Sequence, residues 1–576
     1  MMPYARRAAA HVLGLAVARV LGRNVARTLA LFALLSLAPV LAAAQDTTSS
    51  APAYRIAYRL LMTQPATHLF DVEVKVEGLK GARQVDFQMP RWSPGRYAVF
   101  DFAKNVQEVT ALGDCPPASR CGTEGKPVTR LDTQTWQVVT RESDSVTLNY
   151  KVFADDLSGT FSQLDARHAS FNGGSVFVYV VGHKQDPVSL QIGAPAGWKV
   201  FNGYTTRPDQ TDFRFPNYDI LIDTPTEVGP DFSVQTFEVG GKLYRVVVHS
   251  LADEGGRRDE LTRAVERIVR AETATMPAPD YEQYTFIFHF DPTTRRGDGM
   301  EHLNSTQIVE TGALSSRDVF DDALDSAAHE FFHVWNVKRM RPVGLGPWDF
   351  TRPVVTQGLW IAEGFTNYYG PLSLRRAGLW NDEQLFKSYA GTIGGIENAP
   401  GSRLMSAVES SVLAPFLDRG HAEQRTNLAN TSVSYYPKGE TLALVLDLLI
   451  RGRSNGRVSL DDVMRRAYRE FYAEGQNDSY YLKGHGYTIE DFSRVASEVA
   501  GFDLSDFFER HAYGVQPPPY DEALGYVGLR LVRAQAPRPS NAGLTVEAAR
   551  TTYRIEKDEH ATPEGRALRD AWLKGR

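Results

Sequence analysis

Cysteine is scarce in this chain, because only Cys115 and Cys121 occur among 576 residues. Two cysteines alone make a poor metal site, so a metal centre built on thiolates is not expected. Both lie in one Pro- and Gly-containing loop segment, Gly113-Asp-Cys-Pro-Pro-Ala-Ser-Arg-Cys-Gly122. In an exported protein, this close spacing favours a small loop-closing disulfide with a structural role.

Blocks of basic residues are also missing, and the chain has no internal repeat. Lys and Arg number 63 against 69 Asp and Glu, a formal net charge of −6. Without a basic patch, nucleic-acid binding is not expected. The 43% hydrophobic and 23% charged content is ordinary for a soluble globular protein.

The long apolar run lies near the N-terminus, at residues 28–41. Arginines precede this run, Ala42-Ala43-Ala44 follows it, and the first 44 residues contain no acid. A basic stretch, a short apolar stretch and an Ala-x-Ala end predict a signal peptide over residues 1–44. The alternative is an uncleaved membrane anchor, but Arg23 and Arg27 interrupt any longer apolar span. We therefore expect export to the periplasm or the medium. An acidic mature protein with no stable membrane association should remain.

The length predicts two to four domains. Residues 45–240 show short alternating runs separated by Gly, Pro, Asp and Asn, which predict an N-terminal antiparallel β-domain such as a sandwich. The expected strands in this region are 54–61, 69–76, 135–139, 145–153, 175–181, 188–192 and 233–239.

Residues 241–515 have the pattern of a second, mostly helical domain. It should open with strands at 244–250 and 284–291 on either side of a helix at 257–274. Further helices are expected at 316–338, 357–376, 382–396, 437–451, 460–474 and 489–500. Residues 516–576 have only weak strand signals, at 527–532 and 544–546, and a charged helical end.

The segment His329-Glu330-Phe-Phe-His333 lies on the expected helix 316–338. Residues four apart share one helix face, so both histidines can bind a single metal ion. The expected helix 357–376 offers Glu363 in an apolar setting, where a lone carboxylate would be costly to bury without a cation. His329, His333 and Glu363 therefore form a candidate zinc site with an open fourth position. The alternatives are a helix with two surface histidines and a partly exposed acid.

Two further residues are candidates for the chemistry of a zinc hydrolase. Glu330 is placed to act as the general base that takes a proton from a metal-activated water. A donor is also needed for the oxyanion that forms at the attacked carbonyl. Tyr436 is the candidate, Tyr435 is its competitor, and an ordinary core or surface tyrosine is the remaining alternative.

The segment Gly297-Asp-Gly299-Met300-Glu301-His302 follows an expected strand. Glycine permits close approach of the backbone to a substrate, and Glu301 could bind a cationic amine. Gly299, Met300 and Glu301 are therefore candidate substrate-binding residues. A solvated carboxylate is the alternative for Glu301, and His302 is expected to pack or to hydrogen-bond.

Several of these segments, taken together and in order, resemble the glycyl aminopeptidase family. These are Gly299-Met-Glu-His302, His329–Arg339, Leu359-Trp-Ile-Ala-Glu-Gly-Phe-Thr-Asn-Tyr-Tyr369, Tyr436-Pro-Lys-Gly439 and Trp92-Ser-Pro-Gly-Arg-Tyr97. Members are gluzincin metallopeptidases related to aminopeptidase N, and they often carry a PDZ domain. The tail here is too short for a full PDZ domain, so a tail or a reduced PDZ-like module is expected instead.

The resemblance implies a multidomain α+β protein with a thermolysin-like catalytic domain behind the β-domain. It implies one Zn²⁺ ion per chain, held by His329, His333 and Glu363, with Glu330 as the base. It implies that Glu301 corresponds to the acid that holds the substrate's α-amine in related aminopeptidases. It also favours Tyr436 over Tyr435 as the oxyanion donor.

The expected function is an exported zinc aminopeptidase that removes N-terminal residues, such as Gly or Ala, from peptides. One alternative is an endopeptidase with the same zinc site, in which Glu301 binds no amine. Another is a non-catalytic peptide-binding protein with a structural zinc ion. The sequence does not indicate an oligomeric state.

Overall fold

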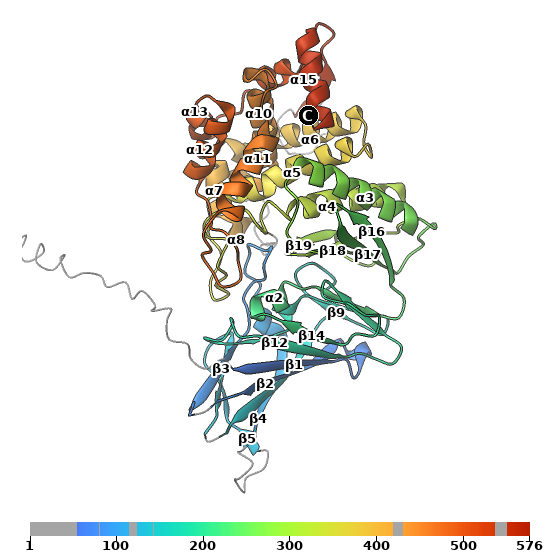
Figure 1. Ribbon diagram of the computed structural model, residues 1–576, viewed down its shortest axis with the longest axis vertical. Helices are drawn as coiled ribbons and strands as arrows, with labels where there is room; N and C mark the ends of the chain where they lie inside the picture. The colour runs from blue at the N-terminus through green and yellow to red at the C-terminus, as the bar shows by residue number, and fades with distance from the viewer. Residues whose placement is uncertain are drawn as a thin grey trace, which may run out of the picture. The chain divides into compact units, whose positions relative to one another are not determined.

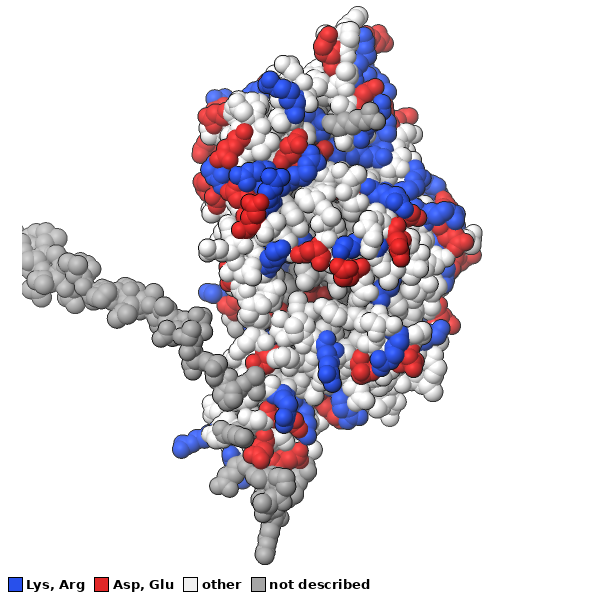
Figure 2. Space-filling model, viewed as in Figure 1, with Lys and Arg blue, Asp and Glu red and all other residues white. Residues whose placement is uncertain are grey.

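The computed structural model describes residues 54–79, 81–114, 124–141, 143–418, 430–535 and 550–575. The predicted signal peptide and the predicted Cys115–Cys121 disulfide lie outside these residues. Within them, no helix is both long and apolar enough to span a membrane. On the face shown in Figure 2, the described acidic and basic side chains are interspersed.

The N-terminal part of the described chain is β-rich, as predicted. Its largest sheet has the strand order β14-β12-β1-β2-β8-β4-β5. Strand β2 alternates half-buried and buried residues along its length, because successive side chains point to opposite faces. These strands are β1 (Arg55–Leu61), β2 (Leu69–Glu77), β4 (Val106–Asp114), β5 (Glu124–Lys126), β8 (Ser145–Phe153), β12 (Val188–Gly193) and β14 (Asp212–Phe215).

One pairing in this sheet departs from the predicted antiparallel arrangement. Strands β1 and β12 run parallel, with Ile56 opposite Val188. Alternation within a strand predicts which side chains are buried, but it contains no information about the direction of a partner far away in sequence. The chain therefore crosses back to β1 over a long connection that local patterns do not reveal.

Two four-stranded sheets complete the β-rich part, in the orders β13-β15-β10-β9 and β11-β3-β7-β6. The predicted strand 175–181 is mostly irregular, since only Tyr179 and Val180 pair, after a 3₁₀ turn at Gly173–Ser175. The strands are β3 (Gln84–Gln88), β6 (Val128–Arg130), β7 (Thr135–Val139), β9 (Gln163–Leu164), β10 (Ala169–Phe171), β11 (Tyr179–Val180), β13 (Lys199–Asn202) and β15 (Thr226–Gly229).

A mixed five-stranded sheet follows, in the order β16-β17-β18-β20-β19. Strands β17, β18 and β20 are parallel, while the edge strands β16 and β19 are antiparallel to their neighbours. The bounds are β16 (Ser233–Val239), β17 (Lys242–Ser250), β18 (Gln283–Phe290), β19 (Asp298–Glu301) and β20 (Ser305–Glu310). Because β16 and β17 form one hairpin, the predicted domain boundary at residue 240 falls inside this sheet.

The two faces of this sheet have different neighbours. Tyr244, Val246 and Val248 of β17 belong to the large apolar core shared with the helices. Val247, between them, packs instead with Ile287 and Phe232 in a small separate cluster. Figure 1 shows helices α3 (Arg258–Thr275) and α4 (Arg317–Phe332) over the first face.

The described residues between 317 and 526 are mostly helical, as predicted, but several helices differ from the prediction. Helix α4 ends at Phe332 instead of 338, and the predicted helix 460–474 changes to a π-helical turn after Tyr468. The other long helices are α5 (Leu359–Arg376), α6 (Asp382–Asn398), α10 (Tyr435–Arg453), α11 (Leu460–Tyr468) and α12 (Ile489–Ala500). The short helices α7 (Ala407–Val412) and α8 (Ala414–Leu417) were not predicted.

Helices α5 and α10 cross at two glycines. A Cβ atom on Gly364 would lie 2.3 Å from the Cα of Gly439, so only glycine allows this approach. Each glycine is close to a candidate site residue, Glu363 on α5 and Tyr436 on α10. The crossing therefore brings the start of α10 next to the zinc-ligand candidate of α5.

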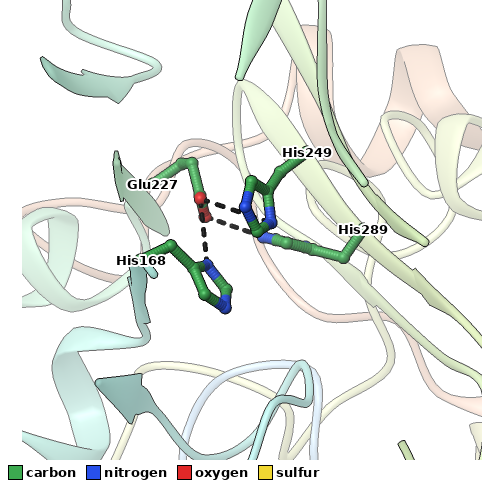
Figure 3. A group of neighbouring side chains, drawn as sticks. All are labelled: His168, Glu227, His249 and His289. Carbon is green, nitrogen blue, oxygen red and sulfur yellow. Dashed lines mark hydrogen bonds and ion pairs between the residues drawn. The ribbon is translucent and has the colours of Figure 1, made fainter. Parts of the chain in front are cut away.

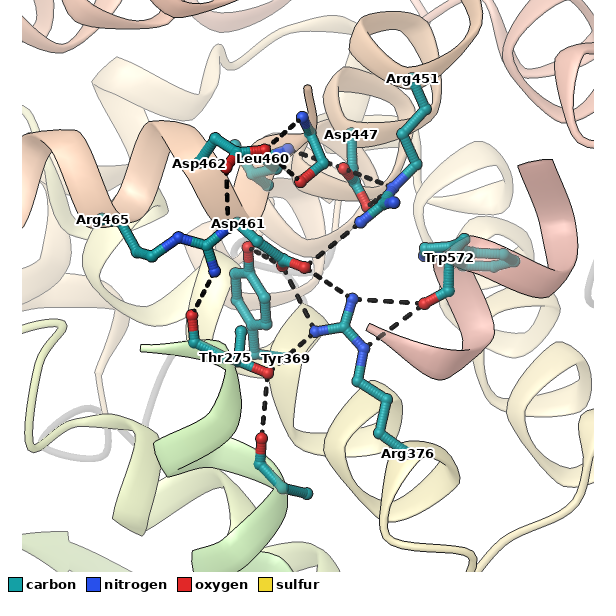
Figure 4. A network of polar contacts seen from close by, with 12 residues as sticks. Thr275, Tyr369, Arg376, Asp447, Arg451, Leu460, Asp461, Asp462, Arg465 and Trp572 are labelled. Atoms are coloured by element: carbon teal, nitrogen blue, oxygen red, sulfur yellow. Dashed lines mark hydrogen bonds and ion pairs between the residues drawn. The ribbon is translucent and has the colours of Figure 1, made fainter. Parts of the chain in front are cut away.

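The C-terminal residues form helix α14 (Tyr520–Tyr526), a hairpin of β21 (Leu529–Gln535) and β22 (Thr551–Lys557), and helix α15 (Pro563–Lys574). Trp572 of α15 is buried and donates from Nε1 to the Tyr368 hydroxyl of α5 at 2.8 Å. Its carbonyl accepts from Arg376, which also pairs with Asp461 at 2.9 Å (Figure 4). The predicted tail is thus joined to the helical core. The predicted strand 544–546 lies outside the described residues.

Candidate active site

Helix α4 presents three of the candidate side chains. His333 follows the last residue of the helix but keeps helical backbone angles, φ −60° and ψ −16°. The i, i+4 spacing therefore still directs His329 and His333 to one side, with their Nε2 atoms 3.0 Å apart. His333 is buried, and the His329 side chain is 19% exposed.

Glu363 of α5 completes this group. Its Oε2 lies 3.5 Å from His329 Nε2 and 3.3 Å from His333 Nε2. In a tetrahedral zinc site with ligand bonds of 2.0–2.1 Å, neighbouring ligand atoms lie about 3.3 Å apart. The three observed separations bracket this value, so His329, His333 and Glu363 fit a zinc ion without rearrangement.

A hydrogen bond on the side of the ring away from Glu363 fixes the orientation of His333. Its Nδ1 donates to the Asn336 carbonyl at 2.7 Å, which leaves Nε2 as the ring nitrogen that faces Glu363. The Asn336 amide donates in turn to the carbonyl groups of Ile361 and Ala362 at 2.9 and 3.0 Å. Asn336 thereby couples the turn after α4 to the first turn of α5, which directly precedes Glu363.

The charges at this centre attract cations. Burial disfavours a protonated His333, but the nearby Glu363 and Glu301 carboxylates outweigh that effect and raise the pKa of His333 to about 10. Burial also works against an ionised Glu363, yet the two histidines hold the pKa of its carboxyl well below the usual range. A divalent ion placed between these groups would neutralise the negative charge of the same carboxylates.

Glu330 lies on the inner side of α4 and is buried. Burial, together with the Glu301 and Glu363 carboxylates, raises the pKa of Glu330 to about 8 against the opposing effect of His333. Its Oε2 has no hydrogen-bond partner among the described residues. A Cβ atom on Gly299 would lie 2.1 Å from Glu330 Oε1, so the missing side chain at 299 makes room for this carboxylate.

Strand β19 supplies Glu301 and Met300. Glu301, Glu330 and His333 each place one possible ligand atom within 4.8 Å of the others. Met300 is fully buried, and its Sδ would lie 2.1 Å from a Cβ on Gly95. The strand is fixed by Arg96, whose Nη2 donates to Asp298 Oδ2 at 2.6 Å.

A small cavity opens beside Glu301. The β-rich part contributes its segment 92–97, and the helical part contributes the turn after α4. The lining side chains include those of Trp92, Arg96, Tyr97, Glu301, Lys338 and Trp348. The cavity thus has a carboxylate in its wall and aromatic rings around it.

The structure separates the two tyrosine candidates. The ring of Tyr436 faces that of His329, with centroids 6.4 Å apart and planes 26° apart, and it is partly exposed. Tyr435 is buried and packs edge-on against Tyr97 at 6.0 Å. Tyr436 is thus the tyrosine that lies against a zinc-ligand candidate and remains accessible.

Two family patterns match the sequence. Residues 57–230 match the Peptidase M61 N-terminal domain, and residues 322–442 match the M61 glycyl aminopeptidase domain. The chain belongs to the M61 glycyl aminopeptidase family. This M61 protein is accordingly a zinc metallopeptidase, and the second match contains His329, Glu330, His333, Glu363 and Tyr436.

Two solved structures resemble this M61 peptidase. An aminopeptidase N family protein from Idiomarina loihiensis has 27% sequence identity and a TM-score of 0.75. That match covers 84% of this chain and 80% of the other. A mutant M1 zinc metallopeptidase from Deinococcus radiodurans has 14% identity and a TM-score of 0.48, over 81% of this chain and 95% of the other. No curated protein matches the sequence.

One site residue of this M61 peptidase was missed by sequence reasoning. The Tyr97 hydroxyl donates a hydrogen bond to Glu363 Oε1, although the two residues belong to different parts of the chain. Tyr97 lies in the Trp92-Ser-Pro-Gly-Arg-Tyr97 segment, which the family resemblance had marked without assigning it a role. That segment was the available signal. The bond itself joins residues 266 positions apart, which no local pattern could indicate.

Proposed function

We propose that this M61 peptidase is an exported aminopeptidase that removes N-terminal residues, preferably small ones such as Gly or Ala, from peptides. The observation that carries the proposal is the position of Glu301. Its carboxylate lies in the same 4.8 Å group as Glu330 and His333, and it also lines the adjacent cavity. A buried acid there can neutralise the α-ammonium group of a substrate's first residue.

One zinc ion would be held at this site by His329, His333 and Glu363. When bound, the metal supplies Lewis-acid chemistry, because it polarises a carbonyl oxygen and lowers the pKa of a water molecule. The two imidazoles and one carboxylate leave a fourth position open for water and substrate.

Glu330 is the proposed general base. Burial and the neighbouring carboxylates raise the pKa of Glu330 before a metal binds. Its position beside the metal ligands suits a group that accepts a proton from the attacking water and returns it to the leaving amine. The free Oε2 of Glu330 is available for that proton. The burial that raises the pKa also keeps bulk water from competing for the carboxylate.

Tyr436 is proposed to donate its hydroxyl proton in a hydrogen bond to the oxyanion. Burial and the Glu363 carboxylate raise the pKa of Tyr436 well above its ordinary value, so the hydroxyl stays protonated as a donor. Preorganised donors of this kind stabilise the transition state more than the substrate.

Glu301 would then limit cleavage to the first peptide bond by holding the substrate's N-terminus. An α-ammonium group paired with this carboxylate brings the first peptide bond to Glu330 and the metal ligands. Bulky first residues would compete for space with Trp92 and Tyr97 in the small cavity, which supports the preference for small residues.

We extend the proposal to the organisation of the chain. Residues 1–44 would be a cleaved signal peptide, which places the enzyme in the periplasm or outside the cell. The β-rich domain would end near residue 230, where its family match ends, and a thermolysin-like catalytic domain would begin with β16. Peptides would be its partners, and no nucleic acid is expected to bind.

The experiment compares one Gly-initiated peptide with a free or an acetylated N-terminus, using zinc-loaded protein. An aminopeptidase cleaves only the free peptide, because the acetylated form has no ammonium group for Glu301. Glu301→Gln should raise KM for the free peptide. Equal cleavage of both peptides would show an endopeptidase and would remove the amine role of Glu301 while retaining the zinc site.

A further inference from the structure

A second group of histidines lies away from the active site. His168, Glu227, His249 and His289 each place a possible ligand atom within 4.8 Å of the others (Figure 3). Three of the side chains are fully buried, and His249 is 3% exposed. None of the four has a role in the proposed reaction, and none is shared with the zinc-ligand candidates.

Two of the four come from the five-stranded sheet. His249 on β17 and His289 on β18 are direct register partners on neighbouring parallel strands. They follow the alternation of Val247 and Ile287, so they project from the face opposite to the helical core. This face is turned toward the β-rich part, as the bonds from Arg245 to the Gly203 and Thr205 carbonyls also show.

The other two come from an antiparallel pair in the β-rich part. Glu227 lies on β15 and His168 immediately precedes β10, which pairs with β15. Gly229 makes room for this histidine, because a Cβ atom there would lie 3.2 Å from the His168 Cβ. The cluster is therefore assembled from three strands of two sheets and the residue that precedes β10.

The spacing suits a small metal ion. Glu227 Oε2 lies 2.7 Å from His289 Nε2, while Glu227 Oε1 lies 3.1 Å from His168 Nδ1 and 3.9 Å from His249 Nδ1. Ligand atoms around tetrahedral zinc lie about 3.3 Å apart, in the middle of this range. The separation of 3.9 Å is too long for a hydrogen bond, so His249 faces the carboxylate without bonding to it.

The hydrogen bonds of His168 also favour a metal ion at this cluster. Its Nε2 lies 2.9 Å from Gln163 Oε1, which can only accept, so Nε2 carries the proton. The Nδ1 lone pair of a neutral His168 then faces the Glu227 carboxylate directly. Either a second ring proton on His168 or a metal ion between the two atoms would supply the positive charge that this contact favours. The Gln163 contact is also the outer-shell partner that histidine ligands usually have.

We propose that His168, Glu227, His249 and His289 bind a second zinc ion with a structural role. Three imidazoles and one carboxylate fill a tetrahedral shell, which leaves no open position for substrate or water. Imidazole nitrogen suits zinc, whereas magnesium and calcium prefer oxygen ligands. The ion would tie the β-rich part to the sheet that carries Glu301.

The alternative is a cluster held by protons alone, in which one or more histidines are cationic and share Glu227. Both arrangements neutralise the buried carboxylate. They differ in metal content and in electron density at the centre, so these are the quantities to measure.

The test is X-ray diffraction from the full-length mature protein, crystallised with zinc, at energies above and below the zinc edge. The proposal expects one anomalous peak at His329, His333 and Glu363 and another bonded to the second cluster at 2.0–2.2 Å. A peak at the first site only, after zinc excess, would overturn it. Zinc at the second cluster but not at His329, His333 and Glu363 would contradict the proposed function and leave the second zinc site supported.

Metal content of variants gives an independent reading. His289→Gln should lower the zinc bound by one ion per chain, while the exposed His560→Gln, a matched control, should keep the wild-type content. Unchanged zinc in a folded His289→Gln protein would contradict the second site. If His289→Gln fails to fold, the diffraction experiment on the unaltered protein still decides.

Discussion

The Tyr97 hydroxyl donates a hydrogen bond to Glu363 Oε1, and so links the β-rich part of the chain to a zinc-ligand candidate. Burial and the Glu363 and Glu301 carboxylates raise the pKa of Tyr97 well above its ordinary value, which keeps the hydroxyl protonated as a donor. The other oxygen, Oε2, faces the two histidines. Tyr97 therefore orients the carboxylate for metal binding.

Removing this hydroxyl should weaken the site. We expect Tyr97→Phe to lower zinc affinity or kcat/KM roughly 10- to 100-fold, as for other groups that orient metal ligands. Competition with a chelator measures the affinity. Tyr204→Phe is the control, because the Tyr204 hydroxyl makes no hydrogen bond to a described residue. Equal zinc affinity and activity in Tyr97→Phe and wild type would show that the bond has no such role.

The two tyrosines at the start of α10 should behave differently. Tyr436→Phe should lower kcat about 100- to 1,000-fold with little change in KM, because it removes a donor used mainly in the transition state. Tyr435→Phe should have a much smaller effect, since its ring packs in the interior. Steady-state kinetics on a free Gly-initiated peptide distinguishes them. A larger loss in Tyr435→Phe would reverse the assignment.

Gly299 should tolerate no side chain. Alanine there would put a methyl group 2.1 Å from Glu330 Oε1, so the carboxylate must move away from the metal ligands. We expect Gly299→Ala to lose most of its kcat while it still binds zinc. Gly125→Ala is the matched control, another strand glycine with open space around its Cβ position. Full activity in Gly299→Ala would mean that Glu330 does not need its present position.

Glu440, a buried acid on α10, should make stability depend on pH. Burial raises the pKa of Glu440 to about 8 in the folded protein, against about 4.3 in an unfolded chain. The folded state therefore holds the Glu440 proton more tightly than the unfolded chain does. The stability that Glu440 contributes is complete below pH ~4.3 and is lost as pH rises toward 8. Between these values the free energy of unfolding should fall by up to about 1.4 kcal/mol per pH unit from this group.

Glu440→Gln removes that dependence, because the amide is neutral at every pH. Urea unfolding at pH 5 and pH 8 should show the variant gaining stability relative to wild type at the higher pH. The exposed Glu559→Gln serves as control and should run parallel to wild type. A constant difference between Glu440→Gln and wild type at both pH values would contradict the raised pKa.

Much of the candidate zinc site could be proposed from the sequence because its signal is local. His329 and His333 are one helical turn apart, and Glu363 and Tyr436 lie in short segments typical of the family. The first and last residues of strands Thr135–Val139 and Ser145–Phe153 agree with the prediction, since alternating burial repeats every two residues. These features depend on neighbours in sequence.

The remainder depends on contacts between distant residues. The parallel pairing of β1 with β12, the Tyr97–Glu363 bond and the Gly364–Gly439 crossing each join segments with no shared pattern. The cluster of His168, Glu227, His249 and His289 is the extreme case, because each member lies alone in its own segment. Such sites become visible only when the sheets are assembled.

The most direct test of the central claim is Glu330→Gln, with zinc content and turnover measured on the same sample. Glutamine keeps the size of the side chain but cannot accept the proton from water. The variant should therefore bind as much zinc as wild type and lose essentially all hydrolysis of the free Gly-initiated peptide. Substantial hydrolysis at full zinc content would contradict the assignment of Glu330 as the base.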